Sequence, residues 1–261
     1  MRKINALIIG IFLTAFLLFF LGCVTDTASL KIEKSLPQNK LAYYNDSFDN
    51  FRSDLWDKAG YIYNEAQEAN FKLADMRFEH GKLRIETKTG CFSKRGLGSK
   101  YVLRGDFDVQ VDCKIDFLEG MHNMDQEIRF AVVEKSKKIV TGNAVFVRLI
   151  KIGGSGSGKL VSASLDNGNY HSGTWYGIDG FDGTFRIIRK GRDISTLYRN
   201  RGEEAWEQLD TFWSTSKDLL IGLYIQNFTP VRTSITAKAP ITATFDNFKI
   251  NAAEEIIEGE I

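Results

Sequence analysis

Residues 100–117 alternate between apolar and polar side chains almost without a break. From Phe107 to Phe117 every second residue is apolar, and the residues between them are polar or charged. This period of two indicates a β-strand with one buried and one solvated face, because a helix would spread the same apolar residues around its whole circumference. The stretch therefore favours an all-β protein.

Similar short segments recur along the chain between turn-forming residues. The pair His80-Gly81 predicts a hairpin, and Arg104-Gly105-Asp106 is expected to turn the chain between strands at 96–103 and 107–117. Further strands are expected at 127–133, 144–152, 159–165, 184–190, 195–199, 206–209, 219–226 and 241–250. Strands spaced in this way predict a two-sheet antiparallel β-sandwich, or jelly roll.

The N-terminus has a separate character. Arg2 and Lys3 precede an uncharged apolar run over residues 6–21, which ends in Gly22-Cys23. This layout resembles a bacterial lipoprotein signal peptide, and the resemblance implies cleavage after Gly22 and acylation of Cys23, with palmitate among the acyl groups. An uncleaved membrane anchor is the alternative, since the run is nearly long enough to span a bilayer.

Both interpretations hold the domain at a membrane and place it outside the cytoplasm. Val24 rather than Asp follows the cysteine, and resemblance to Gram-negative lipoproteins then implies the outer membrane. We expect residues 1–22 to be the signal peptide and 23–42 a lipidated tether. Residues 43–252 would form the sandwich, and 253–261 a frayed acidic tail.

Charge and motifs exclude two classes of partner. The formal net charge is +1, and it falls to −1 when Arg2 and Lys3 are removed, so the chain lacks the basic surface that nucleic-acid binders need. Residues 153–159 resemble a phosphate-binding loop, but Leu160 replaces the required Ser or Thr and a strand pattern follows. We therefore expect neither a nucleic acid nor a nucleotide.

Two cysteines remain once Cys23 is assigned to lipid. Cys113 points to the apolar face of its strand, whereas Cys91 follows Gly90 in an expected turn. An oxidising compartment permits a disulfide between them, and two separate thiols are the equal alternative.

Several short motifs follow one another along residues 43–251. They are Asp46-Ser-Phe-Asp49, Gly81 to Glu86, Leu97 to Tyr101, Gly105 to Val109, Gly183 to Gly191, Tyr198 to Trp206, Leu220 to Leu223 and Phe245 to Ile250. Taken together, these motifs resemble the concanavalin A-like lectin/glucanase superfamily. The resemblance implies two curved antiparallel sheets, a glycan-binding or catalytic groove on the concave face and, in many members, a structural calcium ion.

The laminarinase-like hydrolases of this superfamily carry three acidic residues on one strand. Here Asp125 and Glu127 could share a face, but Arg129 stands where the third acidic residue would be. A retaining mechanism needs two suitably spaced carboxyl groups. We therefore favour a protein without hydrolase activity, and a hydrolase or lyase with Asp125 and Glu127 as its carboxylates is the alternative.

A binding site is predicted in the segment 166–179, which we expect to be a glycine-rich loop. Sugar rings stack on aromatic side chains, and their hydroxyl groups need polar side chains nearby. The candidate ligand contacts are Tyr170, Trp175, Tyr176, Asn167 and Asp179. The alternative is that Trp175 only closes the end of the sandwich.

A structural calcium site is a further expectation. The first and last strands of related sandwiches lie close together, so Asp46 or Asp49 could meet Asp246 and supply the oxygen ligands that calcium prefers. The alternative is that Asp246-Asn247 turns a bulge.

The sequence as a whole predicts an envelope lipoprotein whose β-sandwich binds a polysaccharide without cleaving it. The rivals are a glycoside hydrolase or lyase and a structural or protein-interaction lipoprotein.

Overall fold

The structure is a computed structural model. It describes residues 30–60, 71–89, 92–117, 125–135, 143–152, 157–213, 217–228 and 239–258. The proposed signal peptide, Cys23 and Cys91 lie outside these ranges. Within them, no helix is long and apolar enough to cross a membrane.

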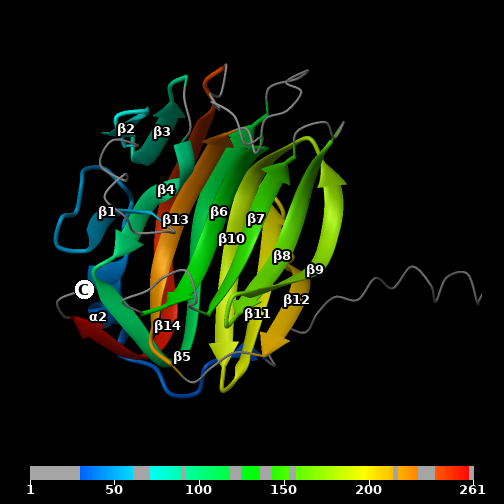
Figure 1. The fold of residues 1–261 in the computed structure, drawn as a ribbon. Coiled ribbons are helices and arrows are strands. Elements are labelled where there is room, and N and C mark those ends of the chain that lie inside the picture. The colour runs from blue at the N-terminus through cyan, green and yellow to red at the C-terminus, as the bar shows by residue number, and fades with distance from the viewer. Residues whose placement is uncertain are drawn as a thin grey trace, which may run out of the picture.

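The described chain is almost entirely strand (Figure 1). Its helix, α2, covers Gln38–Tyr44. The strands are β1 (Trp56–Gly60), β2 (Ala74–Glu79), β3 (Lys82–Thr87), β4 (Phe92–Ser99), β5 (Tyr101–Asp116), β6 (Asp125–Glu134), β7 (Ala144–Lys151), β8 (Gly158–Asp166), β9 (Asn169–Ile178), β10 (Gly180–Lys190), β11 (Asp193–Asn200), β12 (Glu207–Trp213), β13 (Leu219–Phe228) and β14 (Thr242–Glu258).

The strands form two antiparallel layers. The front sheet, which faces the viewer in Figure 1, has the order β1-β4-β13-β6-β7-β8-β9. The back sheet has the order β12-β11-β10-β5-β14-β3-β2. A single pair, Leu103 with Leu219, joins the two layers through β5 and β13. The predicted two-sheet antiparallel sandwich is confirmed.

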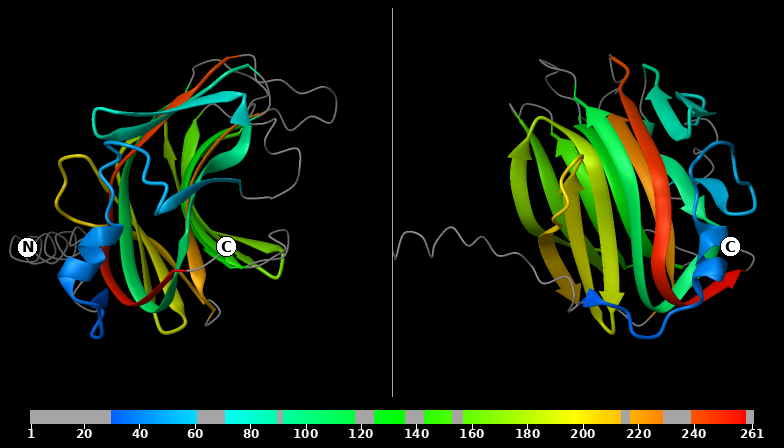
Figure 2. Two further views of the ribbon diagram at one scale, coloured as in Figure 1. Left: turned by 90° about the vertical axis from the view of Figure 1, so that its left-hand side faces the viewer. Right: turned by 180° about the vertical axis from the view of Figure 1, so that it is seen from behind.

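The front sheet is curved, and Figure 2 shows it from the side. Its outer face, called the front face below, lies on the concave side. The chain crosses between the layers at Lys100, where β4 of the front sheet ends and β5 of the back sheet begins. The hairpin at His80-Gly81 also forms as predicted, with both residues at positive φ of 55° and 68°.

The alternation in β5 builds the middle of the core. Its inward residues are almost fully buried between the layers: Phe107, Val109, Val111, Cys113 and Ile115. The residues between them face outward and bond across the back sheet. For example, Asp112 accepts a hydrogen bond of 2.6 Å from Thr184 Oγ1 on β10. The period of two therefore predicted both the strand and the face that it buries.

The turn predicted at Arg104-Gly105-Asp106 does not form, because β5 runs unbroken through it. Gly105 has a φ of 72°. Ala253 of β14 pairs with Phe107 of β5, and the next pair is Glu255 with Arg104, so β5 covers three residues where β14 covers two. This extra residue on one strand is a β-bulge. Bulges and turns both use glycine at positive φ, so the prediction found the right residue and the wrong feature.

The expected frayed tail is also wrong, since β14 continues to Glu258 and pairs with β5 as far as Tyr101. Its charged side chains alternate with residues such as Ala253 and Ile256 that pack on the core. Backbone pairing with β5 orders a segment whose composition alone suggested fraying.

The domain also begins earlier than residue 43. Ile32 is only 7% exposed and packs on Ile188 and Leu197 at the outer face of the back sheet. Leu36 N donates to Ala253 O at 2.8 Å, and Leu41 in α2 is fully buried. We call residues 30–44 the N-terminal strap, which Figure 2 shows in blue along one end of the back sheet.

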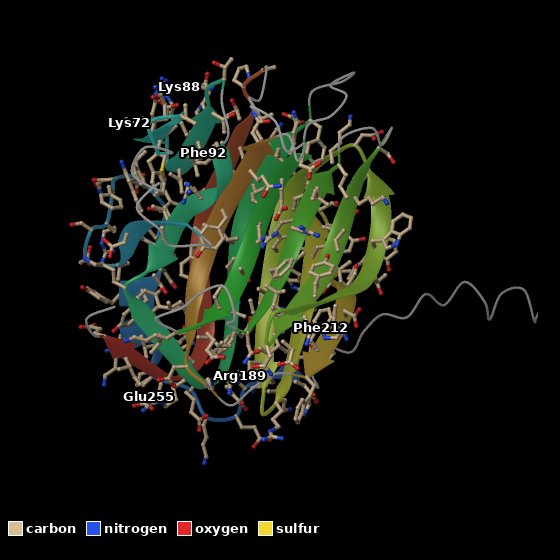
Figure 3. The ribbon with its side chains drawn as sticks, viewed as in Figure 1. Lys72, Lys88, Phe92, Arg189, Phe212 and Glu255 are labelled. Carbon is tan, nitrogen blue, oxygen red and sulfur yellow. The ribbon has the colours of Figure 1, made fainter. Side chains whose placement is uncertain are left out.

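Other contacts fasten the same end of the sandwich. Arg189, labelled near the lower end of β10 in Figure 3, donates from Nη1 to Lys217 O at 2.8 Å. Phe212, labelled on β12, lies where β12 approaches β9. The approach of β12 to β9 brings one edge of each layer together.

Cys113 is a free thiol in the structure and is only 3% exposed. Burial raises the pKa of this thiol well above its ordinary value, and nearby Asp112 and Asp182 add to the effect. The structure thus places Cys113 as a buried core residue without a disulfide.

The packing of Gly96 generates the first prediction. A Cβ on Gly96 in β4 would lie 1.9 Å from Leu223 O, a backbone atom that cannot move aside cheaply. We expect Gly96→Ala to lower the free energy of unfolding by about 3 kcal/mol, the cost of overpacking a tight core position. Denaturant titration monitored by circular dichroism measures it.

Gly177→Ala is the matched control, since Gly177 also lies in a strand of the front sheet but has no atom within 4 Å of its Cβ position. This change should alter the free energy of unfolding by less than about 1 kcal/mol. Equal losses for the two variants would contradict the packing of β4 on β13.

Candidate functional site

The front face carries polar side chains in the middle of a sheet. Opposed residues of antiparallel strands point to the same side, so the registers define rows across this face. One row runs from Tyr224 on β13 through Arg129, Arg148 and Val161 to Trp175 on β9. The row crosses the sheet from its centre to its β9 edge.

A buried ion network forms the floor of this face. Arg129 Nε donates to Glu127 Oε1, and Arg148 Nη1 donates to Glu127 Oε2 at 3.0 Å. The Glu127 side chain is only 1% exposed, against 14% for Arg148. Burial disfavours the charged form of Arg148, but Glu127 and Tyr170 outweigh burial and raise the pKa of the guanidinium.

Aromatic rings surround these charges. The Arg129 guanidinium lies 4.1 Å from the ring centre of Phe146, and Arg148 lies 5.4 Å from the same ring. Arg148 Nη2 also donates to Tyr170 Oη at 2.7 Å. Cations over aromatic faces are attracted by the ring quadrupole, so the network holds Phe146 and Tyr170 in fixed positions.

The segment predicted to be a glycine-rich loop is instead the edge strand β9. Asn167 and Gly168 have positive φ values of 48° and 83° and close the β8–β9 hairpin. An Asn-Gly pair is the strongest short signal for such a hairpin, and it was present in the sequence. The sequence did not predict this strand, because its polar and aromatic residues are interspersed with glycines, which are typical of a loop.

A bulge in β9 decides which aromatic residues share the front face. Val161 pairs with Trp175 while Ala163 pairs with Ser172, so β9 has one extra residue here. The bulge brings Trp175 to the same face as Tyr170. Thr174 N at the bulge donates to Asp210 Oδ2 on β12 at 3.0 Å, which fixes the distortion. Both rings are accessible, with 49% of Tyr170 and 56% of Trp175 exposed.

Lys159 completes the edge of the front face. It pairs with Ile150 and Gly177, so it points to the same side as Trp175. Its Nζ lies 4.5 Å from the centre of the Trp175 ring. Gly158 and Lys159 end the sequence that resembled a phosphate-binding loop, and they begin strand β8, where Lys159 contacts an aromatic ring.

The remaining predicted ligand contacts do not join Tyr170 and Trp175. Tyr176 pairs with the core residue Leu160 and points to the opposite side, where it contacts Tyr198. Asn167 lies in the hairpin turn, and its Nδ2 donates to Asp166 Oδ1 at 3.0 Å. Asp179 is an exposed residue in the connection from β9 to β10. The structure therefore gathers two of the five predicted contacts.

Of the catalytic candidates, both carboxylates belong to the front face of β6. Asp125 begins the strand, and Glu127 lies in the floor between two arginines. Arg129 occupies the next position on the same face, as the sequence indicated. Glu127 is therefore held as the counter-charge of Arg129 and Arg148.

Two of the three residues predicted to hold calcium, Asp46 and Asp49, accept other hydrogen bonds. Asp49 Oδ2 accepts one of 2.6 Å from Ser47 Oγ, whereas Asp246 lies opposite Asp112 on β5. Asp46 accepts hydrogen bonds from Phe48 N and from Trp56 Nε1 at 2.7 and 2.8 Å, and burial raises the pKa of its carboxyl group. Asp46 does bridge to Phe248, so the two chain ends meet as expected. Nevertheless, the described residues contain no group of three His, Cys, Asp or Glu side chains that could hold a metal ion.

Sequence reasoning missed Phe146, Arg148 and the role of Lys159. Every second residue of β7 points to the front face, namely Ala144, Phe146, Arg148 and Ile150. Residues on both faces of β7 are buried, however. A strand buried on both sides reads as a continuous apolar run, so the pattern did not mark the front face.

Comparisons with known proteins support the fold. No protein-family model matches the chain, and no curated protein matches it. Among solved structures, a LamA variant from Zobellia galactanivorans in complex with laminaritriose and laminaritetraose has a TM-score of 0.57 at 11% identity, covering 84% of this chain and 99% of that chain. A Bacillus licheniformis β-glucanase has a TM-score of 0.51 at 14% identity, covering 84% and 99%.

A glycan-binding module gives a similar result. The CBM2 module of an evolved Dit protein of Lactobacillus casei BL23 phage J-1 has a TM-score of 0.52 at 10% identity, covering 80% of this chain and 95% of that chain. The protein thus has the concanavalin A-like sandwich fold that these glucanases and this module share. At such identities the likeness shows the fold, and function must be argued from the site.

The floor generates the second prediction. Glu127→Gln would leave the buried Arg129 and the partly buried Arg148 without their shared carboxylate, so we expect a loss of about 3 kcal/mol in the free energy of unfolding. Asp54→Asn is the control, because the Arg52–Asp54 pair is partly exposed, with 31% and 44% of the two side chains accessible. It should cost less than about 1 kcal/mol.

Denaturant titration of both variants distinguishes the two roles of Glu127. A carboxylate kept for catalysis can be replaced with little loss of stability, whereas a shared counter-charge cannot. A Glu127→Gln variant as stable as the parent protein would contradict the ion network described above.

Proposed function

We propose that this protein is an exported lipoprotein whose sandwich binds a polysaccharide at the front face without cleaving it. The observation that carries the proposal is the placement of Tyr170 and Trp175. Both are large, exposed aromatic side chains, and the β9 bulge aims them to one side of a curved sheet. Sugar rings stack on such surfaces through their apolar C–H faces.

The surroundings of these rings supply the polar half of a sugar site. Arg148 donates a hydrogen bond to Tyr170, and its side chain is 14% exposed beside that ring. Lys159 Nζ lies 4.5 Å from the centre of the Trp175 ring. Fixed polar groups beside an exposed aromatic surface give orientation and specificity to a bound ligand.

The solved structures of similar fold point in the same direction. One is named as a complex with laminaritriose and laminaritetraose, and another as a carbohydrate-binding module. Binding without cleavage is favoured because Arg129 takes the position of the third acidic residue and Glu127 is shared by two arginines. Retaining hydrolysis requires one carboxylate as nucleophile and another as acid/base catalyst.

We test binding and cleavage together by running the purified full chain through affinity gels of several polysaccharides and assaying released reducing ends. Trp175→Ala should weaken retention about fivefold or more, because it removes a stacking surface worth about 1 kcal/mol or more. No reducing ends should appear with the parent protein.

Trp213→Ala is the matched control. Trp213 is 70% exposed and lies under Arg192 much as Trp175 lies beside Lys159, but it is on β12 of the back sheet. Its loss should leave retention unchanged. Release of reducing ends by the parent protein, lost in Asp125→Asn or Glu127→Gln, would instead establish an enzyme. If neither binding nor cleavage is detected and another protein co-purifies, an interaction role is favoured.

The membrane anchor is a separate part of the proposal, supported by the basic residues, the apolar run and Gly22-Cys23. Labelled palmitate should enter the parent protein and not Cys23→Ser, and this variant should leave the membrane fraction. Equal partition of the two proteins into membranes would contradict acylation and favour the uncleaved span. Fractionation of inner and outer membranes tests the proposed outer-membrane location.

A further inference from the structure

The front faces of β7, β8 and β9 have an unbalanced charge. Arg148 and Lys159 are their charged residues, and no carboxylate points to this side from any of the three strands. The residues that the registers place there are Ala144, Phe146, Arg148, Ile150, Lys159, Val161, Ala163, Leu165, Tyr170, Ser172, Trp175 and Gly177.

The neighbouring strand does not cancel this excess. On β6 the carboxylate of Glu127 is shared between Arg129 and Arg148, so one acidic group faces two basic groups. Asp125 lies farther along β6, at its first residue. The front face of β6 thus carries one net negative charge, from Asp125, Glu127 and Arg129, against two positive charges on β7 and β8, so one positive charge remains.

Lys159 is the accessible cation of this edge. Within the described ranges no ion pair involves its ammonium group, and its Nζ lies 4.5 Å from the centre of the Trp175 ring. A ring attracts a cation without neutralising it. A ligand stacked on Trp175 would thus lie beside a positive charge that has no carboxylate partner there.

We propose that the site is specific for an acidic saccharide, one whose sugar rings carry carboxylate or sulfate groups, with Lys159 as the specificity-determining residue. This inference rests on the proposed function, because it names the substrate class of the same site. The sugar ring would stack on Trp175 while its anionic group pairs with Lys159 Nζ. Ammonium–carboxylate and ammonium–sulfate hydrogen bonds are shorter and stronger than neutral ones.

Matched ligands test this proposal. The ligands are a neutral glucan oligosaccharide, the same oligosaccharide oxidised to a carboxylate at C6, and a sulfated derivative, which share one sugar backbone and differ in the anionic group. Titration calorimetry with the full chain in detergent should show tighter binding of the anionic forms, and the difference should shrink as salt is added. The carboxylated and sulfated ligands show which anion the site prefers.

Lys159→Gln should lower affinity for the preferred anionic ligand about fivefold, the effect of one partly exposed ion pair, and leave affinity for the neutral ligand nearly unchanged. Arg192→Gln is the control, since Arg192 lies 4.7 Å from the Trp213 ring away from the site. It should change neither affinity.

Equal binding of neutral and anionic ligands, or a preference that survives Lys159→Gln, would overturn the acidic specificity and leave glycan binding intact. Absence of binding to all three ligands, together with no retention on the polysaccharide gels, would overturn the proposed function itself. The two failures are therefore distinguishable.

Discussion

The mutual burial of two apolar sheet faces is the constraint on which the rest of this structure depends. Strand β5 shows it most clearly, since its inward residues from Phe107 to Ile115 are almost fully buried. Each side chain on this face is excluded from water by side chains of the other sheet. The front sheet therefore turns its inner face to the back sheet, and its concave front face is left for a second use.

That second use differs between the floor and the edge of the front face. The floor, with Glu127, Arg129 and Phe146, is buried and closely bonded, so it holds its shape. The edge, with Trp175 and Lys159, is exposed and can meet a partner. A rigid floor under an accessible edge keeps the aromatic surface in place, so little conformational entropy is lost on binding.

The sequence predicted the features that depend on local patterns. The period of two identified β5 and its buried face, and His80-Gly81 identified a hairpin. The features that failed depend on distant partners: Gly105 forms a bulge because β14 pairs across it, and residues 253–258 are ordered by β5 rather than by their own composition. Likewise, Ile32 is fixed by Ile188 and Leu197, which no local pattern connects to it.

The candidate site was predictable in part for the same reason. Composition indicated Tyr170 and Trp175, because exposed aromatic residues among glycines suit a ligand site. It could not separate Trp175 from Tyr176, since the bulge that reverses the alternation is fixed by Asp210 on another strand. It also could not place Lys159 beside Trp175, which requires the register of β8 with β9.

The position of β14 has a consequence for the order in which the protein can form. The last strand of the chain lies inside the back sheet, between β5 and β3. Until residues 242–258 have been synthesised, β3 with β2 has no neighbour to join it to the rest of that sheet, and the N-terminal strap lacks its bonds to Ala253. Contacts between chain ends so far apart in sequence close large loops and slow folding. The back sheet can therefore be completed only after residues 242–258 have been made.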